Sequence, residues 1–196
     1  MKLTIKRQES YSRGELLLRT FFGWIYIAIP HYFLLFFVGI WAAILSFVSF
    51  WVVLFTGKYP QSFYEFRVGY IRWGIRLQAR ISNLSDGYPS FGVKGTDEYT
   101  EFEMLYPDKL SRGLLLLRVF FGWLYVLIPH GFILFFRAIA TGFVIFIAWW
   151  IVLITAKYPK GFHDFVAGTI RWSTRVGLYM GFMTDTYPPF TGKELE

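Results

Sequence analysis

An uncharged stretch of 38 residues, from Thr20 to Gly57, most constrains how this chain folds. About 18 to 20 consecutive apolar residues are enough to cross the hydrocarbon core of a bilayer, and this stretch is much longer. It is also longer than the apolar part of a signal peptide. The chain is 55% hydrophobic and only 17% charged, whereas an average soluble domain is about a quarter charged. The sequence therefore predicts an integral membrane protein.

The chain also contains an internal duplication. A shift of 99 residues aligns residues 12–91 with residues 111–190 without a gap, and 39 of the 80 aligned positions are identical. The period is too long for a solenoid repeat, so we interpret the duplication as two homologous membrane modules. We expect a polar segment over residues 1–11, membrane repeats over 12–91 and 111–190, an acidic linker over 92–110 and a tail over 191–196.

The second repeat indicates how often each repeat crosses the membrane. Arg137 divides its apolar block into stretches of 18 and 19 uncharged residues, each about 27 Å long as a helix. Small residues follow as far as Gly142, and the aligned Val38–Ala43 also contains glycine and alanine, which suits a tight turn. We expect each repeat to form a transmembrane helical hairpin, with the basic segments of both repeats on the cytoplasmic side. One tilted span per repeat is the alternative.

An amphipathic helix is expected after each apolar block. Over Phe63–Leu84 and Phe162–Met183, aromatic or aliphatic residues recur every three or four positions, with arginines along the flank. A basic, aromatic helix of this kind lies in the headgroup plane and binds anionic lipid. The fold class is thus an all-α integral membrane protein with two repeats, each a hairpin followed by an interfacial helix. The side chains expected to contact headgroups are Arg72, Arg76, Arg80, Arg171, Arg175, Trp73 and Trp172.

The order of the motifs resembles a bacterial membrane family known as domain of unknown function 4389. These motifs are Pro-His, a long apolar stretch, Lys-Tyr-Pro, a Phe-rich turn, Arg-Trp and a closing TDTYPPF. The resemblance is strongest at TDTYPPF (residues 184–190), whereas SDGYPSF (residues 85–91) lacks the second proline. The resemblance covers both repeats and implies a multi-pass protein of the bacterial cytoplasmic (inner) membrane. It implies no activity.

Three polar residues lie within the apolar blocks and form a candidate intramembrane site. His31 and His130 follow a proline in each repeat, and a histidine at membrane depth can ligate haem or relay protons. We instead expect each to bond a carbonyl that the proline leaves free, without a cofactor. Arg137 is a functional candidate because it is charged. We expect it to lie at the hairpin turn and to extend its guanidinium to the headgroups.

The sequence favours a non-catalytic scaffold or accessory subunit. There is no cysteine, so disulfides and thiolate metal sites are excluded, and motifs for metalloproteases, nucleotide binding and serine hydrolases are missing. The aligned Asp86 and Asp185 are interpreted as turn and capping residues, and no metal site is expected. With a net charge of +7, the expected partners are anionic lipids and other membrane subunits or a second copy, and not nucleic acid. A small transporter or channel, with a pathway between the repeats, is the alternative. An enzyme acting on lipid headgroups ranks third.

Overall fold

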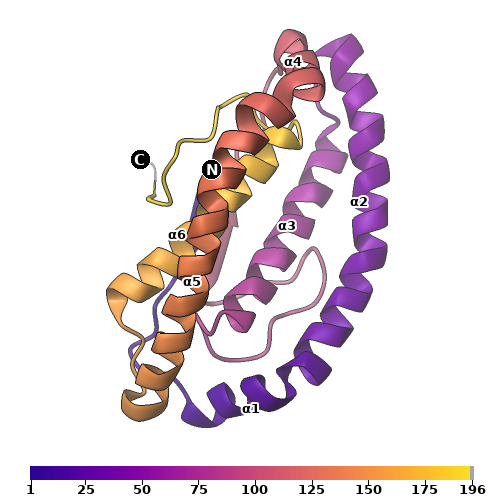
Figure 1. Ribbon diagram of the computed structural model, residues 1–196. Coiled ribbons are helices and arrows are strands. Elements are labelled where there is room, and N and C mark those ends of the chain that lie inside the picture. Colours follow the sequence, from indigo (N-terminus) through magenta and orange to yellow (C-terminus); the bar gives the residue numbers. More distant parts are fainter. Residues whose placement is uncertain (195–196) are drawn as a thin grey trace.

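The computed structural model describes residues 1–194 (Figure 1). Its main elements are β1 (Lys2–Ile5), α1 (Arg13–Gly23), α2 (Ile29–Thr56), α3 (Gln61–Ile81), β2 (Thr100–Glu103), α4 (Arg112–Gly122), α5 (Ile128–Thr155) and α6 (Lys160–Met180). Two π-helical segments, η1 (Trp24–Ala28) and η2 (Trp123–Leu127), join α1 to α2 and α4 to α5. Both repeats therefore have the same order of strand, long bent helix and second helix.

Each repeat contains one long helix instead of the expected hairpin. α1, η1 and α2 form one continuous helix, as do α4, η2 and α5, and each is 44 residues long. The expected turns near Val38–Ala43 and Arg137–Gly142 lie inside α2 and α5. An unbroken helix pairs the backbone groups of this apolar stretch internally, whereas a turn would leave some of them unpaired away from water. The prediction of two spans per repeat was wrong.

The ends of the long helices follow from local sequence. The hydroxyls of Ser12 and Ser111 accept hydrogen bonds from the backbone N–H three residues later, at 3.2 and 3.3 Å, as serine does at a helix N-cap. At the other end, Gly57 and Ala156 adopt the left-handed conformation, with φ of 73° and 57°. Lys-Tyr-Pro follows in both repeats, and the proline cannot continue the helix.

An approximate two-fold relation joins the two repeats. Figure 1 shows α2 and α5 running in opposite directions. The N–H of Leu110 donates to the carbonyl of Gly57 at 2.7 Å, and the aligned N–H of Tyr11 donates to the carbonyl of Ala156 at 2.8 Å. The start of each repeat is therefore bonded to the end of the other repeat's long helix.

The same approximate two-fold symmetry relates the two strands. β1 and β2 form an antiparallel sheet in which Leu3 is opposite Phe102, and these residues are 99 positions apart. Both side chains are buried in the main hydrophobic core. The structural repeat thus begins before Ser12 and includes part of the polar N-terminal segment and of the linker.

α3 and α6 are the central helices, and each packs along the long helix of its own repeat. Trp73 and Leu77 of α3 pack against Ile27 and Leu35 of the first long helix. Nine of the 21 residues of α3 and 11 of the 21 of α6 are buried, and they include Arg76, Arg80, Arg171 and Arg175. This corrects the expectation of interfacial helices, because protein covers the side that was expected to face headgroups.

The long helices, in contrast, are largely uncovered. Both are long and apolar enough to cross a membrane, and only 17% and 11% of their most apolar stretches are buried. The core helix of a soluble protein is also long and apolar, but it is mostly buried, whereas these two helices are mostly exposed. We call the exposed side chains of residues 21–55 and 120–154 the apolar surface. It includes Phe21, Trp24, Phe33, Phe47, Phe55, Phe120, Phe132, Phe146 and Ile154.

Candidate functional site

Each repeat ends in a closing segment that returns to the start of its own long helix. The closing segments are Asp86–Phe91 and Asp185–Phe190. The carboxylate of Asp86 accepts the backbone N–H of Ser12 at 2.6 Å and pairs with Arg19 at 2.8 Å. Both charged side chains are nearly buried, so the ion pair is shielded from water. The first closing segment therefore fixes the N-terminus of the first long helix.

The second repeat has the same contacts. Asp185 accepts the N–H of Ser111 at 2.6 Å and pairs with Arg118. Arg118 also donates to the backbone carbonyls of Tyr179 and Thr184, at 2.9 and 2.7 Å. Because a carboxylate at a helix N-terminus also interacts favourably with the helix dipole, Asp185 stabilises this end in two ways.

The tyrosine of each closing segment compensates for the proline inside the long helix. Pro30 has no N–H, so the carbonyl of Tyr26 lacks its helical partner. The hydroxyl of Tyr88 donates to this carbonyl at 2.9 Å. In the second repeat, the hydroxyl of Tyr187 donates to the carbonyl of Tyr125 at 3.0 Å. The Tyr-Pro motif thus satisfies the backbone at the bend of each long helix.

His31 lies between a tryptophan and a phenylalanine of its own repeat. The indole N–H of Trp73 donates to its Nδ1 at 2.8 Å, and the ring of Phe91 stacks on the imidazole with centroids 4.0 Å apart. Because Nδ1 accepts, the proton of the neutral ring lies on Nε2. Trp73 is therefore a buried partner of His31, which corrects its assignment as a headgroup contact.

His130 has the same surroundings in the second repeat. Trp172 donates to its Nδ1 at 2.9 Å, Phe190 stacks on it at 3.9 Å, and its Nε2 lies 3.2 Å from the hydroxyl of Tyr187. The expectation that the histidines bond the carbonyls freed by proline was wrong, because the tyrosines do so. Each imidazole is enclosed by residues of its own repeat, so His31 and His130 do not face one space, as a shared haem would require. Within residues 1–194, no three His, Asp or Glu side chains are grouped to hold a metal ion.

One pair of aligned arginines in α3 and α6 holds the sheet. Arg72 donates to the carbonyl of Phe102 at 2.9 Å, and the aligned Arg171 donates to the carbonyl of Leu3, also at 2.9 Å. These carbonyls belong to the two residues that face each other in the sheet. The two arginines therefore connect the central helices α3 and α6 to the strand pair.

The next arginines bind the loops that follow the closing segments. Arg76 donates to the carbonyls of Gly92 and Gly95, both at 2.6 Å, and it is fully buried. The aligned Arg175 donates to the carbonyls of Thr191 and Lys193 at 3.0 and 2.8 Å. All these arginines were expected to contact lipid headgroups. They instead supply donors to backbone carbonyls, those of the strands for Arg72 and Arg171 and those of the loops for Arg76 and Arg175.

Arg80 has an acidic partner in the linker. Arg80 and Asp97 form an ion pair of 2.5 Å between two buried side chains. Burial raises the pKa of Asp97, but hydrogen bonds from Arg80 and Thr100 outweigh burial and hold that pKa below its ordinary value. In the second repeat Tyr179 takes the position of Arg80, and burial raises its pKa to about 12. Arg80 is thus also unavailable as a headgroup contact.

Arg137 extends from the middle of α5 to α6. Its Nε donates to the hydroxyl of Thr169 at 2.9 Å, its Nη2 donates to the carbonyl of Phe165 at 3.0 Å, and its guanidinium lies 4.2 Å from the Phe165 ring centroid. It does not lie at a turn, which corrects that expectation. In the first repeat the aligned residues are Val38 and Tyr70, so a small side chain on the long helix faces a large one on the central helix.

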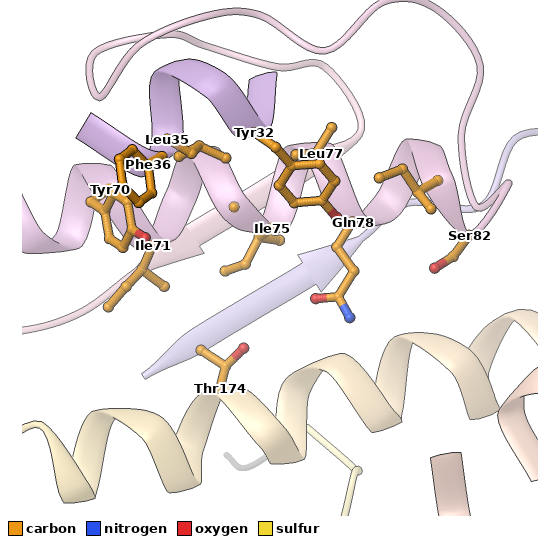
Figure 2. A pocket seen from close by; sticks show the side chains of 12 residues that line it. Tyr32, Leu35, Phe36, Tyr70, Ile71, Ile75, Leu77, Gln78, Ser82 and Thr174 are labelled. Carbon is orange, nitrogen blue, oxygen red and sulfur yellow. The ribbon is translucent and has the colours of Figure 1, made fainter. Parts of the chain in front are cut away.

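A groove lies between α2, α3 and α6 (Figure 2). Its larger part has a volume of about 740 Å³, and an adjoining part that shares Ile71 and Thr174 has about 490 Å³. Figure 2 shows Ile71 and Ile75 of α3 on one side and Thr174 of α6 on the other. Mostly apolar pockets of this size with a few polar groups are typical of small-molecule sites. We call this space the central groove.

A protein-family model matches both repeats. The family described as domain of unknown function (DUF4389) covers residues 15–92 and 113–192. The chain belongs to this family. It contains two tandem DUF4389 copies, which confirms the resemblance seen in the motifs. No curated protein and no solved structure matches the chain.

The contacts of the closing segment explain the motif that carries the resemblance to DUF4389. The predicted capping role of Asp86 and Asp185 is what the structure has, but the ion pairs with Arg19 and Arg118 were missed. A signal for these pairs was present, because arginine and aspartate are identical in both repeats and 67 positions apart in each. Arg67, which lines the central groove, was also missed. The aligned residue is Val166, so the repeat comparison did not point to it.

Proposed function

We propose that this protein is a non-catalytic membrane protein that is embedded through its apolar surface and serves as a scaffold or accessory subunit of a larger membrane complex. The observation that carries this proposal is the contrast between the uncovered long helices and the internally paired arginines of α3 and α6. A continuous apolar surface of this extent favours contact with lipid or protein. The guanidinium groups of Arg72, Arg76, Arg171 and Arg175 are bound to backbone carbonyls, so these four are not free to act on a substrate.

Polar segments level with the middle of the long helices support embedding from one side. Gly39, in the middle of α2, lies against Tyr70 of α3, and the neighbouring Gly69 lies against Val93 of the linker. If α2 crossed a bilayer, the linker with its exposed Lys94 and Glu98 would lie level with the bilayer centre, where charge is costly. We therefore favour a protein that inserts the apolar surface into one face of the membrane and keeps the linker in water.

The cations at the helix ends support the same arrangement. Lys58, Lys109 and Arg112 gather where α2 ends and α4 begins, whereas Arg13 and Lys157 lie where α5 ends and α1 begins. Crossing helices would place these groups on opposite membrane surfaces, against the usual bias of Lys and Arg to one side. Embedding from one side allows both groups to contact one anionic headgroup layer. The multi-pass arrangement in a bacterial inner membrane is the alternative.

Single cysteines test the arrangement, because the chain has none of its own. Ser12→Cys and Lys58→Cys lie at opposite ends of the first long helix, and Phe36→Cys lies on the apolar surface. A membrane-impermeant maleimide should label Ser12→Cys and Lys58→Cys from the same side of sealed vesicles and leave Phe36→Cys unlabelled. Labelling of the two ends from opposite sides would establish crossing helices. Release of the protein by alkaline carbonate would overturn membrane embedding.

The scaffold role is tested by purification in mild detergent followed by mass spectrometry. We expect the protein to elute with other membrane subunits or as an oligomer, because its exposed aromatic and aliphatic side chains offer a large surface for packing against other membrane helices. The central groove between the repeats favours the alternative of a small transporter. A stable lone monomer that moves a solute across liposomes would replace the scaffold proposal with that alternative.

A further inference from the structure

We infer that the central groove binds one acyl chain of an anionic membrane phospholipid and that Arg67 binds the phosphate of that lipid. This inference rests on the proposed embedding, because the lipid has to enter from the membrane. It adds a specific ligand and a recognition residue to that proposal.

One side of α3 lines the central groove. Arg67, Ile71, Gly74 and Gln78 follow one another at spacings of three or four and line it together. From Arg67 to Gln78 the helix rises about 16 Å, at 1.5 Å per residue. This is about half of the roughly 30 Å hydrocarbon core, which is the depth that one acyl chain occupies. The groove therefore has the length of a lipid tail.

The groove is continuous with the apolar surface. Tyr32 and Phe36 of α2 line the groove, and their exposed fractions are 57% and 63%. Further along α2, small residues line the adjoining part and leave it open, among them Gly39 and Ala43. A lipid that contacts the apolar surface can therefore place a tail in the groove without leaving its apolar surroundings.

Arg67 provides charge at one end of the groove only. Its Nη1 donates to the hydroxyl of Tyr59 at 3.0 Å and to the carbonyl of Gly181 at 2.7 Å. Within residues 1–194, no carboxylate forms an ion pair with it. The aligned residue of the second repeat is Val166, which is uncharged and buried. A half-buried cation beside an apolar surface favours an anionic ligand, and a phosphate offers it charge-assisted hydrogen bonds. The lipid therefore has one orientation, with its phosphate at Arg67 and its tail toward Gln78.

A photoreactive lipid tests the position of the tail. The full chain is placed in phosphatidylcholine nanodiscs that contain a small fraction of phosphatidylglycerol with a diazirine in one acyl chain. We expect cross-links on peptides that contain residues 32–46 and 67–82. A Cβ added at Gly74 or Gly177 meets no atom within 4 Å, so Gly74→Leu with Gly177→Leu should fill the groove and lower these cross-links about tenfold. Gly142→Leu is the matched control, because it also adds a leucine to open space in a helix, outside the groove.

A second pair of variants tests the role of charge. Arg67→Gln should reduce the preference for phosphatidylglycerol over phosphatidylcholine about tenfold, whereas Arg67→Lys should keep most of it. Lys94→Gln, at an exposed cation of the linker that does not line the groove, should leave the preference unchanged. Cross-links confined to the apolar surface, or an unchanged lipid preference in Arg67→Gln, would overturn this inference while leaving the embedding intact. A protein that does not enter nanodiscs at all would instead overturn the proposed function.

Discussion

The indole N–H of Trp73 donates to Nδ1 of His31 at 2.8 Å and joins the central helix of the first repeat to its long helix. The bond lies next to Pro30, where the long helix bends, and Phe91 covers one face of the imidazole. One histidine thus connects three segments that are distant in the sequence. We interpret the Pro-His pair as a structural link between the long helix, the central helix and the closing segment, and not as a ligand site.

Removing this donor should destabilise the fold. In Trp73→Phe, the buried Nδ1 of His31 loses its partner, so the free energy of unfolding should fall by about 1 to 3 kcal/mol. Trp172→Phe should have a similar effect in the second repeat. Thermal unfolding in detergent measures both, and Trp41→Phe, on the apolar surface, is the control. An equal loss in the control would show that the hydrogen bond is not the cause.

The ion pair between Asp86 and Arg19 should contribute more than an exposed pair. Asp86→Asn removes the closer and more buried of the two carboxylates that pair with Arg19 and leaves only Glu15 at 3.4 Å, which should cost about 2 to 3 kcal/mol of unfolding free energy. Glu101→Gln breaks an exposed pair with Lys2 and should cost about 1 kcal/mol or less. Chemical unfolding of the two variants side by side tests the difference. Similar losses would contradict the assignment of Asp86 as the residue that fixes the helix start.

The Arg137 contact should be replaceable by its counterpart from the first repeat. Arg137→Val alone removes two hydrogen bonds, and Thr169→Tyr alone crowds the same space, so each should lower stability by about 1 to 3 kcal/mol. The double variant recreates the pair of Val38 and Tyr70 and should recover part of the loss, with a coupling energy above about 0.5 kcal/mol. Strictly additive losses would argue against an exchange between equivalent pairs.

Acid should weaken the fold through His163. Burial lowers the pKa of His163 below its ordinary 6.5, so the folded protein holds this side chain neutral. The unfolded chain binds a proton near pH 6.5, and stability therefore falls as the pH drops from about 6.5 toward the folded-state pKa. His163→Phe should lose less stability between pH 7 and pH 5 than the unaltered chain. Identical pH profiles of the two proteins would contradict this.

The repeat and the helix ends could be predicted from the sequence, because both depend on local features. Ser12 and Gly57 have the residue types that begin and end helices, and the 99-residue alignment carries the same signals to the second repeat. Local features did not show that the expected hairpin is absent. Arg137 divides the apolar block in the sequence, but its long side chain donates to acceptors on α6 and lets the helix continue.

The site was harder to predict because periodicity shows which residues share a side of a helix and not what covers that side. Arg76 belongs to a stripe typical of an interfacial helix, yet loop carbonyls surround it. Those carbonyls belong to the linker, whose residues show no periodic pattern, so the sequence did not indicate that they would surround Arg76. Arg67 lacks an aligned arginine, and its place at the groove depends on the packing of α3 beside α6.

The reciprocal bonds at the helix ends have a consequence for shorter chains with the same architecture. Leu110 pairs with Gly57 and Tyr11 pairs with Ala156, so each half of this chain supplies backbone partners that the other half needs. A polypeptide with a single copy would leave these groups, and one edge of the strand pair, without partners. Two such polypeptides in a symmetric homodimer would restore every one of these bonds. The present chain therefore has the form of a homodimer whose subunits have become covalently joined and have since diverged at positions such as Arg67 and Arg137.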